Sequence, residues 1–274
     1  MMRRLFLSVV LLAAAVLLSA CHASAGGSDQ VVVTGSTTIL PIAEVSAEMY
    51  HELHPDIRVL VSGVGSSAGI ESVSRGSSDI GTSSRDLKPE EENLGLVDTP
   101  IAYDAIAVIV NPSNPVSSLT KQQVKEVFQG KITNWSELGG NDMSVQLVNR
   151  DQASGTREAF STIVMDKEPF DPAAAVLPGT GQVRFVVADA PGSIGYISFG
   201  FVNPSVKAIA VDGVAPSKET VFSGEYKIRR TLHFFTKGEP KEPAKGYIDF
   251  VLSDAVQESV VQDAGFLPVS GGSQ

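Results

Sequence analysis

Short apolar runs alternate with amphipathic segments along most of this chain, and hydroxyl-rich loops join the two. Val31-Val32-Val33 and the stretch from Ile57 to Val61 have the length and composition of buried strands. Each is followed by a loop of Ser, Thr and Gly, and then by apolar residues at helical spacing. Repetition of strand, loop and helix is typical of an α/β protein, in which several loops gather at one edge of a mostly parallel sheet.

The later elements predict a division into two lobes. An apolar strand is expected from Ile101 to Asn111 and a crossing strand from Tyr226 to Phe235, and the last helix, about 246–264, returns to the first half of the chain. We therefore expect an α/β fold with two lobes, each a mixed sheet flanked by helices. The first lobe would comprise 31–107 with 231–274, and the second, inserted lobe 108–230.

Residues 1–20 have the pattern of a secretory signal peptide. Two arginines precede an apolar run from Leu5 to Leu18, which is too short to span a bilayer as a helix. Leu18-Ser19-Ala20-Cys21 resembles the bacterial lipobox, whose cysteine becomes the lipidated first residue of the mature protein. We expect Cys21 to carry the lipid and 21–30 to tether a soluble body to the membrane. An ordinary cleaved signal with an incidental cysteine is the alternative.

Charge and cysteine content narrow the classes of partner. The chain has 21 basic and 31 acidic side chains, and loss of the signal's two arginines would leave 19 basic ones and a formal charge of −12. Such an acidic surface argues against nucleic acid as a partner, and an anion site would need its donors concentrated in one cleft. Cys21 is the single cysteine, so neither an internal disulfide nor a cysteine metal cluster can form.

The stretch from Arg150 to Arg157 has the features of an anion site at a helix N-terminus. Apolar residues at helical spacing follow Glu158, so Ser154-Gly155-Thr156 is expected to open that helix. The first N–H groups of a helix lack intrahelical partners and lie at the positive end of its dipole, and a glycine permits close approach. Hydroxyl and guanidinium groups add donors that suit an oxyanion.

Two other stretches repeat this design. Thr34-Gly35-Ser36-Thr37-Thr38 leads into a helix expected from Ile39 to His54, and the loop from Ser62 to Gly69 opens a helix that runs to about Arg75. A capped surface helix with charged flanks would explain one such stretch. Three of them favour a common site for an oxyanion.

The second of these loops also fits two enzyme motifs. Gly63 to Ala68 matches the dinucleotide pattern G-x-G-x-x-A, but at the second rather than the first strand–helix turn. Gly65 to Gly69 matches G-x-S-x-G, which would make Ser67 a hydrolase nucleophile and require a later histidine. His233 is the one later histidine, and it lies in an apolar stretch. We therefore expect a binding protein without a cofactor, with a serine hydrolase as the alternative.

The combined stretches, in this order and spacing, resemble the phosphate-binding lipoproteins of bacterial phosphate ABC importers, a family of type II periplasmic binding proteins. The resemblance covers nearly the whole chain after the signal. Its carriers are Gly35-Ser36-Thr37-Thr38 with Pro41, Gly65-Ser66-Ser67-Ala68-Gly69, Asp79 to Arg85, Ile101-Ala102-Tyr103-Asp104 with Ala107 to Asn111, and Arg150 with Ser154-Gly155-Thr156.

This resemblance implies the two-lobed type II periplasmic-binding-protein fold, with inorganic phosphate held in the interlobe cleft as a hinge closes. It also implies membrane permease subunits as partners and a lipid-anchored place in the cell envelope, facing the periplasm or the exterior. We expect a monomer. Another tetrahedral oxyanion, such as sulfate or molybdate, is the alternative ligand. The implied phosphate-binding residues are Thr37, Thr38, Ser66, Ser84, Asp104, Arg150, Ser154, Gly155 and Thr156.

Asp104 is unusual because it lies in an otherwise apolar strand, where a carboxylate should be paired or functional. Some members of the family place a carboxylate where this chain has Ser84. Asp104 is therefore the candidate acceptor for the proton that phosphate keeps near neutral pH and that sulfate lacks. Alternatively, Asp104 caps a loop or pairs with Arg85.

Overall fold

The structure is a computed structural model, and it describes residues 29–269. The expected signal peptide, the lipidation site Cys21 and most of the tether lie outside the described residues. The sequence places residue 30 in the tether, whereas β1 (Asp29–Gly35) already begins at Asp29. The reason is backbone pairing, because Asp29 and Gln30 lie opposite Ile57 and Arg58 of the neighbouring strand.

The first part of the chain alternates strands and helices, as the sequence predicts. After β1 come α2 (Leu40–Leu53), β2 (Ile57–Gly63), α3 (Ser66–Ser74), β3 (Ile80–Ser83) and a 3₁₀ turn, Glu92–Leu94. Pro41 lies in the first turn of α2, where its missing N–H costs no helical hydrogen bond.

The middle of the chain repeats this alternation. Its elements are β4 (Leu96–Val110), β5 (Ser118–Leu119), α4 (Lys121–Phe128), a 3₁₀ turn at Trp135–Leu138, β6 (Gln146–Arg150), α5 (Gly155–Ile163), β7 (Ala175–Leu177), α6 (Thr180–Asp189) and β8 (Ser193–Ser198). Then follow a 3₁₀ turn at Phe199–Phe201, β9 (Lys207–Ala208), β10 (Ala210–Val211) and α7 (Lys218–Phe222).

The chain returns through β11 (Arg229–Lys237) and finishes with α8 (Ala244–Val251), α9 (Asp254–Val256), a π-helical segment (Gln257–Val261) and β12 (Leu267–Pro268). The sequence predicts one continuous helix over about 246–264, but the structure breaks it at Ser253. The backbone of Ser253 is extended, and its hydroxyl donates to the carbonyl of Phe250 at 2.6 Å. A serine that bonds to local backbone groups in this way competes with helix continuation.

One sheet runs through the molecule in the order β2-β1-β3-β11-β4-β8-β6-β7, with β9 and β12 also paired to β4. β1 is parallel to β2 and β3, and β6 is parallel to β7 and β8, whereas β11 and β4 are antiparallel to their neighbours. β4 belongs to both halves, since its first part pairs with β11 and its last five residues pair with β8.

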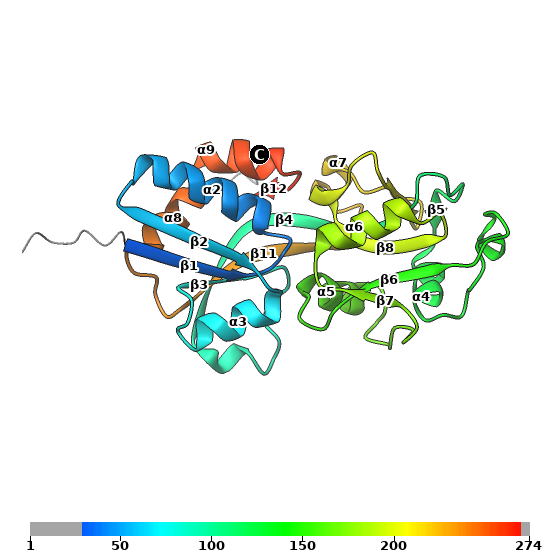
Figure 1. Cartoon of the computed structure of the whole chain (residues 1–274), viewed down its shortest axis with the longest axis horizontal. Coiled ribbons are helices and arrows are strands. Elements are labelled where there is room, and N and C mark those ends of the chain that lie inside the picture. Colours follow the sequence, from blue (N-terminus) through cyan, green and yellow to red (C-terminus); the bar gives the residue numbers. More distant parts are fainter. Residues whose placement is uncertain (1–28, 270–274) are drawn as a thin grey trace, which may run out of the picture.

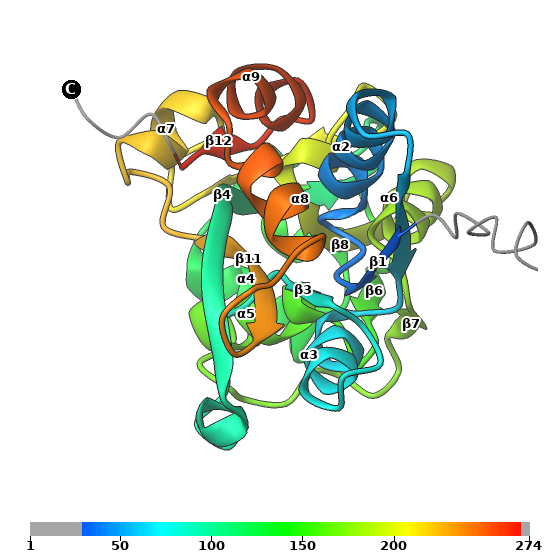
Figure 2. The same cartoon turned by 90° about the vertical axis from the view of Figure 1, so that its left-hand side faces the viewer.

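The apolar core changes partners where β4 and β11 cross between the two halves. Ala102 and Leu232 pack with β1, α2 and α8, whereas Ala105 and Ile228 pack with α4, α5 and β8. Figure 1 shows α2 and α8 on one face of the first half and α3 on the other, with α5 and α6 on opposite faces of the second half. Figure 2, turned by 90°, shows β4 and β11 side by side at the crossing.

Candidate functional site

Four helices begin at the carboxyl ends of parallel strands, and their N-termini converge where the two halves meet. α2 and α3 follow β1 and β2 in the first half, and α5 and α6 follow β6 and β7 in the second. Each helix start carries partial positive charge and unpaired N–H groups. Their convergence therefore makes this junction attractive to an anion.

Arg150, the last residue of β6, lies at the centre of this junction and is 2% exposed. Its guanidinium donates to the hydroxyls of Thr37 at 3.2 Å and Thr180 at 3.1 Å, which come from opposite halves. It also donates to the carbonyls of Leu177 and Pro178, at 3.2 and 2.8 Å. Burial lowers the pKa of Arg150 to about 10, so the side chain stays cationic at neutral pH.

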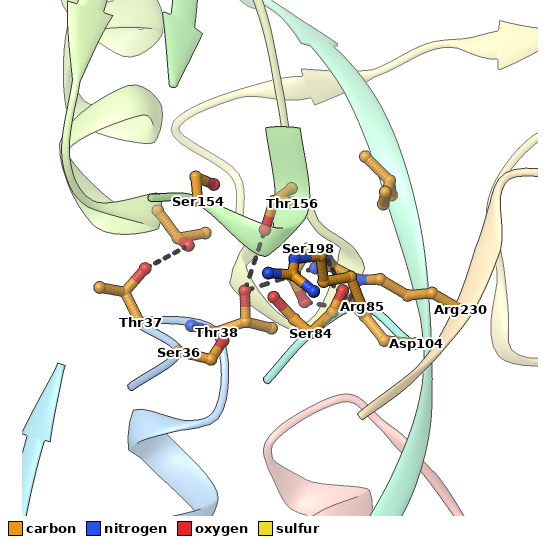
Figure 3. Close-up of polar contacts among 12 residues, drawn as sticks. Ser36, Thr37, Thr38, Ser84, Arg85, Asp104, Ser154, Thr156, Ser198 and Arg230 are labelled. Atoms are coloured by element: carbon orange, nitrogen blue, oxygen red, sulfur yellow. Dashed lines mark hydrogen bonds and ion pairs between the residues drawn. The ribbon is translucent and has the colours of Figure 1, made fainter. Parts of the chain in front are cut away.

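Hydroxyl groups of the two halves face one another beside Arg150. Thr37 and Thr180 have their hydroxyl oxygens 3.2 Å apart, as do Thr38 and Thr156, and Figure 3 shows the second pair joined across the junction. Thr38, Thr156 and Thr180 are each 1% exposed. A hydroxyl can donate as well as accept, so each of these groups can turn its hydrogen toward an anion.

Ser66, Ser84 and Gly155 meet at the start of α3 and α5. The hydroxyls of Ser66 and Ser84 lie 3.3 Å apart, and both serines are buried. A Cβ on Gly155 would lie 2.3 Å from the hydroxyl oxygen of Ser66 and 2.8 Å from that of Ser84. The close contact of the two helix starts therefore requires glycine at this position.

The start of α5 also supplies backbone donors. Ser154 caps the helix by accepting from the N–H of Arg157 at 3.2 Å, and Ser154 is 2% exposed. Gly155 and Thr156 come next, and within residues 29–269 their N–H groups have no protein acceptor. These are donors of the kind that a helix start offers to a bound anion.

Asp104 lies beside this group, and its carboxylate is paired with Arg230 rather than with Arg85. Its Oδ2 accepts from Nε and Nη2 of Arg230 at 2.9 and 2.7 Å, and its Oδ1 accepts from the hydroxyl of Ser198 at 2.8 Å (Figure 3). Burial raises the pKa of Asp104, whereas the charge and hydrogen bonds of Arg230 act against that rise. Arg85 instead pairs with Glu91 at 2.6 Å.

All nine phosphate-binding residues expected from the sequence thus lie in two adjoining groups at the junction. The first group also includes Thr180, and its expected members are Thr37, Thr38, Arg150, Ser154 and Thr156. The second group comprises Ser66, Ser84, Gly155 and Asp104. Arg230 connects the two groups, because it contacts Thr38 at 3.3 Å.

Sequence reasoning missed two residues of this cluster, Thr180 and Arg230. Thr180 opens α6 with apolar residues at helical spacing after it, so a fourth hydroxyl-led helix start was visible in the pattern. Ile228, Arg230 and Leu232 are all buried, and they alternate along the chain at the spacing of one face of a strand. An arginine on the apolar face of a strand signals a buried charge that needs a partner.

The residues of the two enzyme motifs have other contacts. The hydroxyl of Ser67 accepts from Arg85 at 3.2 Å, and the ring of His233 faces Asp98 and Asp86 at 2.8 and 3.1 Å. A Cβ on Gly65 would lie 2.8 Å from the carbonyl oxygen of Ala153, so the second half packs closely against this turn. No hydrogen bond joins Ser67 to His233 in the part of the chain that the structure describes.

Two kinds of feature are absent from the described range 29–269. No helix in it is both long and apolar enough to cross a membrane. Nor do three or more His, Cys, Asp or Glu side chains in it gather closely enough to hold a metal ion.

Known proteins that resemble this chain in sequence and fold include phosphate-binding proteins. A family model for the PBP superfamily domain matches residues 20–255. The chain is 37% identical to the phosphate-binding protein PstS of Bacillus subtilis (strain 168), over 89% of this chain and 82% of that protein. It is 30% identical to the PstS protein of Borreliella burgdorferi, over 87% of this chain and 90% of that one.

Solved structures extend the likeness. A Clostridium perfringens crystal structure, described as a candidate phosphate ABC transporter substrate-binding protein with bound phosphate, superposes with a TM-score of 0.85 at 41% identity and covers 88% of this chain and all of that one. An ABC-type phosphate transport receptor from Vibrio cholerae gives a TM-score of 0.73 at 32% identity, with 86% and 99% coverage. The fold and these relatives place the chain in the PBP superfamily, among the PstS-like phosphate-binding proteins.

Proposed function

We propose that this protein captures inorganic phosphate between its two lobes, outside the cytoplasm, and delivers it to an ABC importer. The observation that carries this proposal is the convergence of four helix N-termini on the buried guanidinium of Arg150. Such a junction offers many donors and a fixed positive charge to an oxyanion. The substrate-binding role of its relatives supports the same conclusion.

The proposed ligand groups come from both lobes. Arg150, Ser154, Gly155 and Thr156 would donate from the second lobe, and Thr37, Thr38, Ser66 and Ser84 from the first. Asp104 belongs to the same cluster through its pair with Arg230. Hydroxyls that now bond to one another would turn to phosphate oxygens in the bound state.

The proposed lobes are 31–107 with 231–274, and 108–230. Their support is the change of core partners between Ala102 and Ala105 on β4 and between Ile228 and Leu232 on β11. Two crossing strands are a simple hinge, and closure about them would bring the helix starts of both lobes onto the ligand.

Calorimetric titration of the phosphate-free protein with phosphate, arsenate, sulfate and molybdate tests the proposal. We expect saturable binding of phosphate, with sulfate and molybdate much weaker. Tighter binding of sulfate or molybdate would assign the site to another tetrahedral oxyanion. If none of the four binds and none raises the melting temperature, the protein is no oxyanion receptor and an acidic surface scaffold becomes the better description.

We further propose that the protein only binds its ligand and does not catalyse a reaction. The contacts of Ser67 with Arg85 and of His233 with Asp98 support this, because a serine nucleophile needs a base within hydrogen-bond reach. Assays with phosphate and carboxylate esters provide the check. Turnover that a folded Ser67→Ala variant loses would establish the hydrolase alternative.

The N-terminal proposal is that Cys21 carries a lipid anchor and that the mature protein is a monomer in the cell envelope. The lipobox-like Leu18-Ser19-Ala20-Cys21 supports it. We expect Cys21→Ser to move the protein from the membrane fraction to the soluble extracytoplasmic fraction, with phosphate binding unchanged. A Cys21→Ser protein that stays in the membrane fraction would contradict the anchor, and light scattering at twice the monomer mass would contradict the monomer.

A further inference from the structure

The pair of Arg230 and Asp104 is the one buried ion pair in the junction, among the residues that the structure describes. The side chains of Arg230 and Asp104 are 4% and 0% exposed. Burying two charges is costly, and a hydrophobic pair of similar volume often stabilises a protein as well or better. A buried ion pair at the edge of an anion site therefore calls for a functional explanation.

Protein donors occupy most acceptor positions of the Asp104 carboxylate. A carboxylate offers about four lone-pair sites. Oδ2 accepts two hydrogen bonds from Arg230, and Oδ1 accepts one from Ser198. Three protein donors thus hold the Asp104 carboxylate against Arg230 and Ser198, instead of leaving it open for the proton of a ligand.

The guanidinium of Arg230, in contrast, extends into the hydroxyl cluster. Its Nη2 lies 3.3 Å from the hydroxyl oxygen of Thr38, which in turn lies 3.2 Å from that of Thr156. Its Nη1 lies 3.1 Å from the carbonyl oxygen of Ser84. These contacts and the two to Asp104 use four of the five N–H groups of an arginine. The fifth has no acceptor among residues 29–269. The bond to the Thr38 hydroxyl is readily exchanged for a stronger one to an anionic oxygen.

We infer that Arg230 is the second guanidinium of the oxyanion site, and that Asp104 is its positioning residue instead of an acceptor for the ligand's proton. This inference rests on the proposed function and adds to it the source of the site's second positive charge. Discrimination between phosphate and sulfate would then not come from Asp104.

The charges at the junction agree with this assignment. Burial is the main cause of the lowered pKa of Arg150, and the positive charge of Arg230 acts in the same direction. Two cations close enough to disfavour each other are stabilised by an anion placed between them. The carboxylate of Asp151 acts on Arg150 in the opposite direction. The positive charge offered to an anionic ligand is therefore local to the two guanidiniums, within a protein whose overall charge is negative.

The neighbouring Arg229 provides a matched control. It is exposed, its Nη1 donates to the carbonyl of Val221 at 3.4 Å, and it lies on the opposite face of β11 from Arg230. We expect Arg230→Gln to weaken phosphate binding by about tenfold to a hundredfold, the equivalent of one charge-assisted hydrogen bond, and Arg229→Gln to leave it within about twofold. Titration calorimetry of the full-length protein in detergent, freed of phosphate, measures both.

Loss of Arg230 alone leaves Asp104 buried and unpaired, which destabilises the fold. The double variant Asp104→Asn with Arg230→Gln avoids this, because a neutral amide pair replaces the ion pair. We expect this variant to fold, as judged by circular dichroism, and to bind phosphate as weakly as Arg230→Gln. A folded double variant that binds phosphate like the wild type would overturn the inference.

The single variant Asp104→Asn separates positioning from proton acceptance. If Asp104 acts through Arg230, Asp104→Asn weakens the binding of phosphate and arsenate and does not raise the affinity for sulfate. In a protein that already carries Arg230→Gln, adding Asp104→Asn then has no further effect on phosphate affinity. A gain in sulfate affinity, or a fall of more than about tenfold in the phosphate-to-sulfate ratio, would show instead that Asp104 accepts the ligand's proton. Absence of phosphate binding by the wild type would refute the proposed function itself. That outcome differs from failure of the inference, in which the wild type binds phosphate and the variants of Arg230 bind it equally well.

Discussion

Individual side chains of the junction divide into those that face the other lobe and those that face away. Arg150 and Arg157 illustrate the difference, since only seven positions separate them. Arg150 is buried among hydroxyls of both lobes, whereas the guanidinium of Arg157 lies over the ring of Phe170, 4.7 Å from its centroid. The two arginines should therefore contribute very unequally to binding.

Arg150→Ala is expected to weaken phosphate binding by about a hundredfold or more, the equivalent of two charge-assisted hydrogen bonds. The physical reason is that the ligand would lose the guanidinium that contacts the hydroxyls of both lobes, in a closed site where water cannot replace it. Arg157→Ala should change the affinity by much less, because it loses only a contact with Phe170. Calorimetric titration compares the two, and a larger loss for Arg157→Ala would contradict the assignment of Arg150.

Gly155 is a position where the addition of a single methyl group should keep the two lobes from closing. In Gly155→Ala the added methyl would lie 2.3 Å from the hydroxyl oxygen of Ser66 and 2.8 Å from that of Ser84. We expect phosphate affinity to fall by at least about tenfold, since the helix starts can no longer approach. Gly181→Ala is the control: nothing lies within 4 Å of a Cβ there, and the same methyl in α6 should leave binding unchanged. Equal affinities of the two variants would contradict close contact at Gly155.

At the scale of elements, an ion pair holds the segment after β3 in place. Arg85 donates to both carboxylate oxygens of Glu91, at 2.6 and 2.8 Å, and to Ser67 at the start of α3. Burial alone would raise the pKa of Glu91, but the hydrogen bonds and charge of Arg85, with the N–H of Lys88, lower it overall. This pair therefore links the segment before β4 to the helix start in the first lobe.

The stabilisation from this pair should depend on pH in one direction. Because the folded state lowers the pKa of Glu91, its contribution is present above the unfolded value of about 4.3 and is lost as pH falls through the folded value. At pH 7, Glu91→Gln should lower the melting temperature by roughly 2–4 °C, the equivalent of about 1 kcal/mol in a protein of this size. The difference should shrink as pH falls below about 4.3 and Glu91 becomes protonated. Thermal melts of wild type, Glu91→Gln and the exposed neighbour variant Glu90→Gln across a series of pH values would test this. A loss that does not shrink on acidification would exclude the pair as its cause.

Within residues 29–269, two long strands, β4 and β11, join the two lobes, and all four helix starts lie at the same junction. A ligand held there by both lobes binds the folded state alone. Phosphate at a hundred times its dissociation constant should therefore stabilise the protein by about 2.7 kcal/mol. We expect the melting temperature to rise with phosphate, to rise less with equal sulfate, and to stay unchanged in Arg150→Ala. Equal shifts with both anions in the wild type would contradict phosphate specificity.

Much of the fold was predictable from local pattern. The strand–loop–helix order of the first part and the helix opened by Ser154 are confirmed. The single C-terminal helix over 246–264 was wrong, because Ser253 bonds to its own local backbone and breaks the helix. α6 was missed, although Thr180 opens it with the same kind of pattern.

The sequence by itself determined the elements, the hydroxyl-rich helix starts and the arginine beside them, because period and capping are properties of neighbouring residues. Only the tertiary structure decided that Asp104 pairs with Arg230, 126 positions away, and that Thr38 meets Thr156, 118 positions away. Those contacts depend on β11 lying between β3 and β4, and thus on the packing of the whole sheet. A period of two shows that Arg230 faces the core, but not which carboxylate lies opposite.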